Sequence, residues 1–262
     1  MKKKIVALLF ITIMSVSVFS CGTDNTKTNN KKQIAELNDA SDNNKDDYFN
    51  WTVDDSLYGL SESGKKQDKI VIPKKCKSIS AVIVTKDSSV KEISFDCTVQ
   101  AEFNANYIAE ADTSIEKIDL PEGMETLGTG SFSTEKKLTE ITFPSSLTKI
   151  EDYAISYCDA FSKVDLSNTK VTSIGKHAFE ECNSVKEIYL PDTIQEIGQF
   201  AFPKSVTDIY IPEKAEIKSF GEDSVLLANE TKVSIHVKKG SWADNNFASW
   251  FNEDTKYTKV YD

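Results

Sequence analysis

The chain has 262 residues, a formal net charge of −10 at pH 7 and a hydrophobic content of 39%. This composition is that of an acidic globular chain, and it excludes both a membrane-embedded protein and a wholly disordered one. All 31 basic residues are lysines, dispersed among 41 acidic residues. That pattern argues against nucleic-acid binding, which needs clustered cations to displace counterions from phosphates.

The first twenty residues have the organisation of a secretory signal. Lys2 to Lys4 precede an apolar run from Ile5 to Phe19, which is too short to span a bilayer comfortably. The run ends in Val18-Phe19-Ser20-Cys21-Gly22, an order that resembles a bacterial lipobox. We therefore predict a signal peptide over residues 1–20 and a lipid on the thiol of Cys21 that anchors the chain to a membrane. The alternative is a plain cleaved signal, which would leave the chain secreted.

Residues 21–47 are rich in Asn, Asp, Lys and Thr and nearly free of aromatic side chains. Such a segment buries too little apolar surface to fold, so we expect a disordered tether after the lipidated cysteine. Its carboxylates could suggest a calcium loop, but the glycine and the terminal glutamate of that loop are missing from the spacing. No metal site is therefore predicted there.

Residues 48–67 contain two short apolar segments separated by turn-forming residues. The first unit of a repeat array exposes its apolar core unless other side chains cover it. We expect residues 48–67 to form this N-terminal cap. The covering side chains would be Tyr48, Phe49, Trp51, Val53, Leu57, Tyr58 and Leu60.

Residues 68–238 repeat one pattern with a period of roughly 24 residues. Each copy contains two apolar residues two positions apart, and in five copies a proline follows the second. The second residues of the pairs are Ile72, Phe95, Leu120, Phe143, Leu166, Leu190, Ile211 and Val237. Apolar residues that alternate with a period of two predict a β-strand, and a proline directly after them ends it. Each copy is therefore predicted to contain one very short strand.

A second apolar cluster follows each predicted strand, as in Ile174–Phe179 of one copy and Ile197–Phe202 of the next. A helical or 3₁₀ turn would place these side chains inward and return the chain to the next strand. The whole copy has the LxxLxL pattern of a leucine-rich repeat. The predicted fold is a leucine-rich-repeat solenoid, a right-handed coil of about seven to eight short parallel β-strands. Its return segments are expected to be irregular, 3₁₀ or short helical, and both ends to be capped.

The repeat pattern stops before residues 239–262. Trp242, Phe247, Trp250 and Phe251 gather in the segment KKGSWADNNFASWFNED, which has the pattern of an amphipathic helix. An aromatic cluster of this kind could form a ligand site, but the last repeat needs cover for its apolar face. We therefore predict that residues 239–262 form a C-terminal cap.

The repeats resemble the BspA-type leucine-rich repeats of bacterial surface proteins, most clearly in IDLPEGMETLGTGSF, ITFPSSLTKIEDYAI, VTSIGKHAFEECNSVKEIYLP and IQEIGQFAF. The resemblance covers about residues 57–250 and is specific to a repeat type, not to an activity. It implies a protein of the bacterial cell surface or envelope, often anchored and in several cases adhesive toward host proteins or other cells.

Catalysis is not expected from this sequence. The two histidines, His177 and His236, lie more than two repeats apart, and no nucleophile, base or metal-ligand grouping accompanies either of them. The prediction is therefore a protein that is not an enzyme and that carries no cofactor and no metal.

Cys158 and Cys182 occupy equivalent positions in adjacent copies. Stacked strands would place them about 5 Å apart, which is within reach of a disulfide. Buried free thiols are favoured because free cysteine is a good small core residue, and a disulfide stays open as the alternative.

The candidate binding site lies on the outward row of the strands, between the paired core residues. Tyr189, Tyr210 and His236 hold this position in three adjacent copies, with Glu187 and Asp208 beside them. Tyrosine is common at recognition surfaces. We expect these residues to contact a protein or glycan partner on a host or neighbouring cell. The alternative is an aromatic ladder that only stabilises an exposed sheet.

Two functions remain compatible with the sequence. The first is a cell-surface-anchored, non-enzymatic binding module, which adheres to a protein or glycan through the exposed strand face. The alternative is a structural or scaffolding lipoprotein of the bacterial envelope with endogenous protein partners. In both cases the N-terminal lipid would hold the chain at the membrane.

Overall fold

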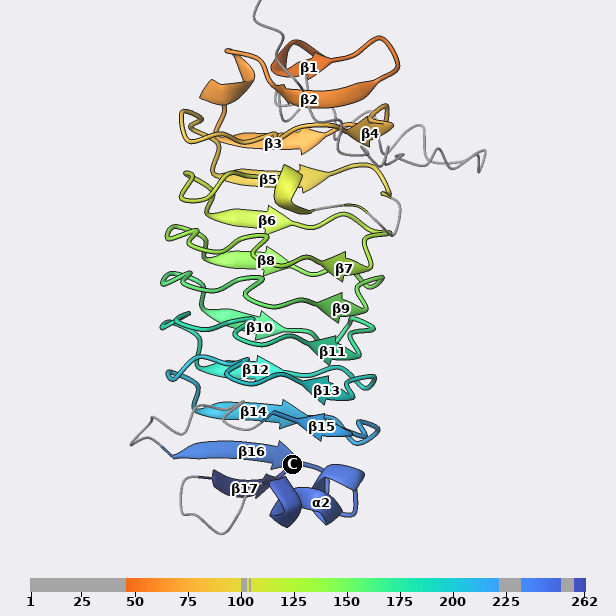
Figure 1. Ribbon diagram of the computed structural model, residues 1–262, viewed down its shortest axis with the longest axis vertical. Coiled ribbons are helices and arrows are strands. Elements are labelled where there is room, and N and C mark those ends of the chain that lie inside the picture. The colour runs from red at the N-terminus through yellow and green to blue at the C-terminus, as the bar shows by residue number, and fades with distance from the viewer. Residues whose placement is uncertain (1–45, 100–102, 104, 222–231, 251–256) are drawn as a thin grey trace, which may run out of the picture.

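The computed structural model describes residues 46–99, 103, 105–221, 232–250 and 257–262. The predicted signal peptide, Cys21 and nearly all of the predicted tether lie outside the described residues. The described chain forms a stack of coils along one axis, with one short strand of each coil above the next (Figure 1). The predicted leucine-rich-repeat solenoid with short parallel strands is confirmed.

One line of strands forms a surface that we call the strand face. These strands are β3 (Lys69–Ile72), β5 (Glu92–Phe95), β6 (Lys117–Asp119), β8 (Glu140–Thr142), β10 (Lys163–Asp165), β12 (Glu187–Tyr189), β14 (Asp208–Ile211) and β16 (Val233–Val237). Each contains the first apolar residue of a predicted pair. Parallel pairing places Ile188 beside Ile209 and Ile209 beside Ile235, so equivalent core residues of successive coils stack on each other.

A second line of strands forms the return face. It consists of β7 (Thr126–Leu127), β9 (Lys149–Ile150), β11 (Ser173–Ile174), β13 (Glu196–Ile197) and β15 (Ser219–Phe220), which pair as one sheet. The return segments otherwise consist mainly of turns, in keeping with the expected irregular structure, and the two-residue strands within them were not predicted from the sequence. Stacking lets each coil bond to the previous one, as when the Gly198 N–H donates to the Ile174 carbonyl at 2.8 Å, and such bonds favour extended backbone. A 3₁₀ helix, η3 (Ala105–Tyr107), lies in an earlier return segment.

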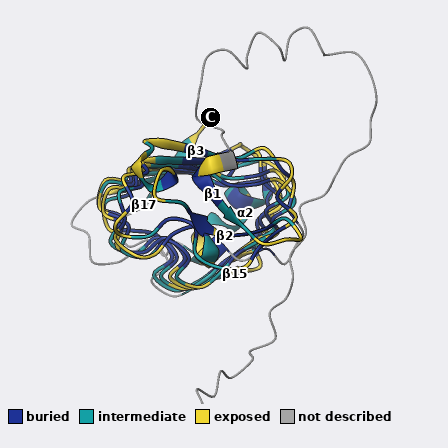
Figure 2. Cartoon of the chain, turned by 90° about the horizontal axis from the view of Figure 1, so that it is seen from above, coloured by how far each residue is buried: buried dark blue, intermediate teal, exposed yellow. Residues whose placement is uncertain are grey.

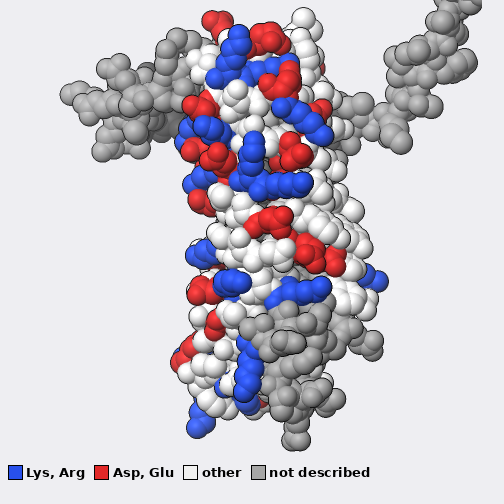
Figure 3. Space-filling model, turned by 90° about the vertical axis from the view of Figure 1, so that its left-hand side faces the viewer, with Lys and Arg blue, Asp and Glu red and all other residues white. Residues whose placement is uncertain are grey.

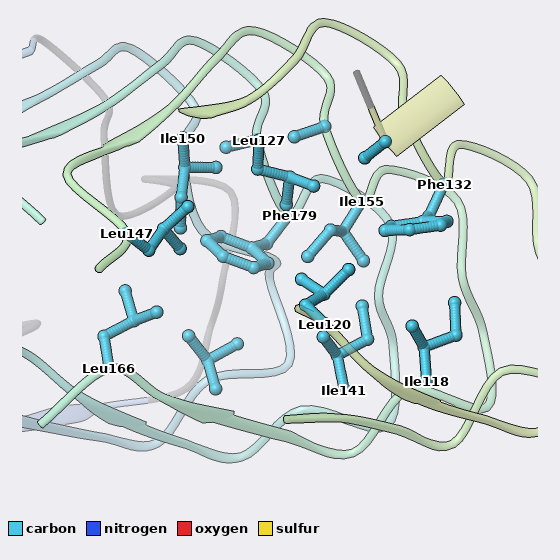
Figure 4. Packing of buried hydrophobic residues seen from close by; sticks show 14 of the residues in the cluster. Ile118, Leu120, Leu127, Phe132, Ile141, Leu147, Ile150, Ile155, Leu166 and Phe179 are labelled. Carbon is cyan, nitrogen blue, oxygen red and sulfur yellow. The ribbon is translucent and has the colours of Figure 1, made fainter. Parts of the chain in front are cut away.

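The core lies between the two faces, seen along the axis in Figure 2. Ile118 and Ile141 from the strand face and Leu127 and Ile150 from the return face point into the same interior (Figure 4). The largest fully buried side chains are Phe132, Phe161, Phe179 and Phe202. A single coil would expose both flat sides of such a core, so each coil depends on its neighbours.

The N-terminal end of the stack is an antiparallel hairpin of β1 (Phe49–Trp51) and β2 (Ser56–Leu60), preceded by η1 (Asp46–Tyr48) and followed by η2 (Gly64–Lys66). The hairpin joins the stack because β2 pairs in parallel with β4 (Ser78–Ile79). Tyr48, Phe49, Leu57 and Leu60 are buried. Val53 and Tyr58 are exposed instead of covering the core, because Val53 lies in the hairpin turn and Tyr58 on the outer side of β2.

At the other end the predicted helix is present as α2 (Trp242–Trp250). The Trp250 ring packs 5.8 Å from the Phe220 ring, so the helix covers the end of the return face. The sequence did not predict β17 (Tyr257–Tyr261), which extends the strand face by pairing in parallel with β16. Phe251 lies outside the described residues. Within the described part of the chain, every helix is too short or too polar to cross a membrane.

Cys158 and Cys182 are buried free thiols, as favoured from the sequence. The Cys158 thiol donates to the Phe132 carbonyl at 3.0 Å, and the Cys182 thiol donates to the Ile155 carbonyl at 2.8 Å. The Cys158 sulfur and burial together raise the pKa of the Cys182 thiol. Both side chains are fully buried and pack as small residues of the core.

Candidate functional site

The candidate site is a column of three rings on the strand face, which we call the aromatic column: Tyr189, Tyr210 and His236. Parallel pairing of β12, β14 and β16 places these residues directly beside one another. The ring centroids of Tyr189 and Tyr210 lie 4.4 Å apart with an interplanar angle of 5°. Those of Tyr210 and His236 lie 4.1 Å apart with an angle of 20°. The structure thus brings together all three predicted rings.

The stacking decides which part of each ring a partner can reach. Because the rings cover each other's faces, the column presents ring edges and hydroxyl groups to solvent. The outer face of Tyr189 is also occupied, since Lys163 Nζ lies 5.4 Å from its ring centroid. At the other end, His236 is paired with Val260 of β17. Both faces of Tyr210 are therefore covered by neighbouring rings, and Lys163 lies near the outer face of Tyr189.

The two predicted acidic neighbours hold the rings in place. The Tyr189 hydroxyl donates to Glu187 Oε2 at 2.8 Å. This hydrogen bond, together with desolvation, raises the pKa of Tyr189, so its hydroxyl remains a neutral donor. Asp208 accepts from the His236 ring at 2.9 Å. Both carboxylates therefore stabilise the column before any partner arrives.

His236 connects the last strands of the stack. Its Nε2 lies 2.9 Å from Asp208 Oδ1 and its Nδ1 lies 3.0 Å from Asp262 Oδ1, at the end of β17. Burial alone would lower the pKa of His236, but the hydrogen bonds to the two carboxylates outweigh it and raise the pKa. The doubly protonated ring, which donates to both carboxylates, is the form that fits this site.

We expect this histidine to make the array less stable as the pH rises. The folded-state pKa is raised above the usual value of about 6.5, so its contribution is complete below that pH and is lost as the pH rises through the folded pKa. The partners are partly exposed, so the contribution should be roughly 1 kcal/mol. Urea unfolding of the wild type and His236→Gln measures it. Their difference should shrink between pH 6 and pH 9, and a difference that stays constant would contradict the assignment.

A second set of stacked rings, on the turns after the return strands, escaped the sequence prediction. Tyr153 and His177 stack at 4.6 Å, and His177 and Phe200 stack at 5.1 Å. All three residues have positive φ angles, of 57°, 55° and 53°. The preceding copy has Gly130 at this position, the residue that such a conformation favours. Each of the three rings lies three residues after the equivalent isoleucine of its repeat, which is Ile150, Ile174 or Ile197. This equal spacing is the sequence signal that could have revealed the second stack.

Charged side chains outside the column largely compensate one another. Lys117 pairs with Glu140 at 2.9 Å, and Lys69 pairs with Glu92 at 3.1 Å, each pair joining adjacent coils. Figure 3 shows acidic and basic side chains interspersed over one side of the stack. Such pairs contribute about 0 to 1 kcal/mol each. Among the described residues, no group of three or more His, Cys, Asp or Glu side chains is placed to hold a metal ion.

Solved structures of bacterial leucine-rich-repeat proteins are similar to this chain. The pneumococcal vaccine antigen PcpA is 22% identical over 82% of this chain and 45% of its own, with a TM-score of 0.46. A leucine rich cell surface protein from Faecalibacterium prausnitzii is 21% identical over 69% of this chain and 50% of its own, with a TM-score of 0.41. The leucine rich repeat protein of T. pallidum is 19% identical over 82% of this chain and 97% of its own, also with a TM-score of 0.41. The chain thus spans about half the length of the first two structures or less.

Sequence comparison assigns the repeat type directly. Six copies of the BspA type leucine rich repeat region match residues 105–225. Among curated protein sequences, none matches the chain significantly. The stacking of β3 and β5 on β6 extends the same architecture toward the N-terminus of the matched region. The repeats over residues 105–225, somewhat less than half of the chain, are therefore of the BspA type, and proteins with such repeats are typically bacterial surface proteins.

Proposed function

We propose that the chain is a non-enzymatic binding module of the bacterial cell surface, and that its strand face contacts a protein partner. The aromatic column is the observation that carries this proposal. Its rings are half-buried, stacked and hydrogen-bonded, so they lose little side-chain freedom when a partner binds. Preordered tyrosines of this kind are common anchors in protein interfaces.

A protein partner suits the column better than a glycan does. Sugar rings pack against the face of an aromatic side chain, and here the faces of Tyr189 and Tyr210 are covered by neighbouring rings and by Lys163. Ring edges and a hydroxyl group can instead meet the mixed polar and apolar surface of a protein. Binding of a glycan becomes an alternative outcome of the experiment below.

The proposal includes display of the array at a membrane. A lipid on Cys21 would anchor the chain, and residues 21–47 would hold the array away from the membrane surface. The partner would then lie on a host cell or a neighbouring cell. An envelope scaffold with endogenous protein partners would use the same strand face. Protease treatment of intact cells separates the two, because cleavage of the array requires outward display.

The test is a double substitution in the column. We expect Tyr189→Ser/Tyr210→Ser to reduce adhesion of the full chain to host matrix proteins, mucus proteins or neighbouring cells at least tenfold, since interface tyrosines often contribute about 2 kcal/mol or more. The matched control is Tyr153→Ser/Tyr157→Ser, because these tyrosines are 41% and 46% exposed but lie on the return turns. Circular dichroism confirms that each variant is folded. Unchanged adhesion of a folded column variant would eliminate the proposal.

A further inference from the structure

Two neighbouring strands of the strand face do not pair. β8 is the last strand of one parallel sheet and β10 is the first strand of the next. Figure 1 shows them farther apart than the strand pairs on either side. At the next junction, the Leu166 N–H donates to the Tyr189 carbonyl at 2.9 Å. The equivalent bond from Phe143 to the Asp165 carbonyl is not formed, although both residues belong to the described chain.

The backbone groups left at this junction can be identified. In a parallel sheet, alternate residues of a strand bond to opposite neighbours. The Thr142 carbonyl accepts a hydrogen bond from the residue after β6, so Ile141 and Phe143 direct their backbone groups toward β10. By the same alternation, Lys163 and Asp165 direct theirs toward β8. Two strand edges with donors and acceptors therefore face each other across the gap.

A cleft of about 480 Å³ occupies the space between these edges. Sites that bind ligands commonly have volumes of about 300 to 1,000 Å³. Ile141 lines the cleft and is 7% exposed, whereas Ile118 and Val164 on the adjacent strands are fully buried. The cleft therefore reaches the edge of the core and has an apolar floor with polar walls.

The opening is confined to the strand face. On the return face of the same coils, Ile150 of β9 pairs with Ile174 of β11, so the stack is continuous there. Phe161 fills the buried position that smaller apolar residues hold in the neighbouring coils. After β10, Ser167 replaces proline, and the connection to the return strand is one residue longer than in the preceding coil. These differences from the other repeats lie in or next to β10, one of the two strands that border the gap. They explain why the gap occurs at this coil.

Charge does not select the occupant of the cleft. Lys163 pairs with Asp165 at 3.0 Å, and Glu140 pairs with Lys117 at 2.9 Å, so the charged side chains of its walls are already compensated. The groups that remain to be bonded are the backbone N–H and C=O groups on the facing edges of β8 and β10. An extended polypeptide presents alternating N–H and C=O groups along both of its edges, which is the chemistry of strand addition.

We propose that the cleft between β8 and β10 is a strand-insertion site for an extended peptide segment of a partner protein. The inserted segment bonds to both strand edges and directs one apolar side chain toward Ile141 and Phe143. It thereby restores the parallel ladder that is interrupted at this coil. The cleft is separate from the aromatic column, so this inference extends the proposed function to a second site, and either site can fail without the other.

The probe is a phage-displayed random dodecapeptide library selected on the immobilised full chain. Asn168→Trp places a ring in the wall of the cleft at an exposed position, and Lys170→Trp adds the same ring nearby but outside the cleft. We expect enriched peptides to bind the wild type and Lys170→Trp equally and Asn168→Trp at least tenfold more weakly. N-methylation of alternate backbone amides in the strongest peptide should also weaken binding at least tenfold.

Hydrogen exchange locates the peptide and separates the two sites. The amides of Ile141, Phe143, Lys163 and Asp165 should exchange quickly in the free chain and slowly once the peptide is bound, also in the Tyr189→Ser/Tyr210→Ser background. Four results would overturn the inference: no enriched peptide, binding that Asn168→Trp leaves unchanged, binding that N-methylation leaves unchanged, or amides that are already protected in the free chain. An oligosaccharide that binds in place of peptides, and is blocked by Asn168→Trp, would also overturn it.

Discussion

Gly198→Ala is expected to destabilise the array by about 3 kcal/mol. A Cβ atom at this position would lie 2.6 Å from the backbone carbon of Gly175 and 2.6 Å from the backbone nitrogen of Lys176. Both atoms belong to the preceding coil, so the contact can be relieved only by moving a whole turn of the stack. The midpoint and slope of urea unfolding, followed by circular dichroism, give the loss in the free energy of unfolding.

Gly128 provides the matched control for this substitution. It holds the same repeat position in an earlier coil, but among the described residues its added Cβ would meet only the Ser131 hydroxyl oxygen, at 3.6 Å. Gly128→Ala should therefore change the free energy of unfolding by no more than about 0.5 kcal/mol. Equal losses in the two variants would show that the coils are not stacked as closely at Gly198 as the structure has them.

Phe179→Ala is expected to cost about 3 to 5 kcal/mol, the usual range for removing a buried phenylalanine. The Phe179 side chain is fully buried, and its ring lies 6.4 Å from the ring of Phe202 in the next coil. It points into the interior together with Ile150 and Ile155 (Figure 4). The substitution therefore leaves a cavity between coils and weakens the contacts on both of its sides.

Tyr157→Ala serves as the control for the loss of a large side chain. Tyr157 is 46% exposed and lies on a return turn, so its replacement should change the free energy of unfolding by no more than about 0.5 kcal/mol. Urea unfolding of both variants measures the difference. A Phe179→Ala variant as stable as Tyr157→Ala would contradict a core shared between successive coils.

The strand face could be predicted because each of its strands repeats a local signal. A pair such as Ile188 and Leu190 alternates with an outward residue, and that alternation placed Tyr189 on the surface. Repetition at a nearly constant spacing then placed Tyr210 and His236 beside it. The aromatic column was therefore predictable from register alone, before any contact was known.

Features that depend on contacts between coils could not be predicted in this way. The return strands are two residues long, too short for a period, and they form because each coil bonds to the one before it. Tyr153 has the left-handed conformation usually taken by glycine, which its residue type does not reveal. The gap between β8 and β10 interrupts a pattern that continues on both sides of it. The sequence marks this coil only by small departures, which are Phe161, the missing proline at Ser167 and a connection one residue longer.

Site-specific photocrosslinking tests most directly the central claim that the strand face meets a protein partner. p-Benzoylphenylalanine replaces Tyr210 in one full-length variant and Tyr153 in another, and each is illuminated while bound to the cells or matrix to which the wild type adheres. The account predicts a covalent protein adduct from position 210 and none from position 153. An adduct from position 153 alone, or adhesion without any adduct from position 210, would contradict it.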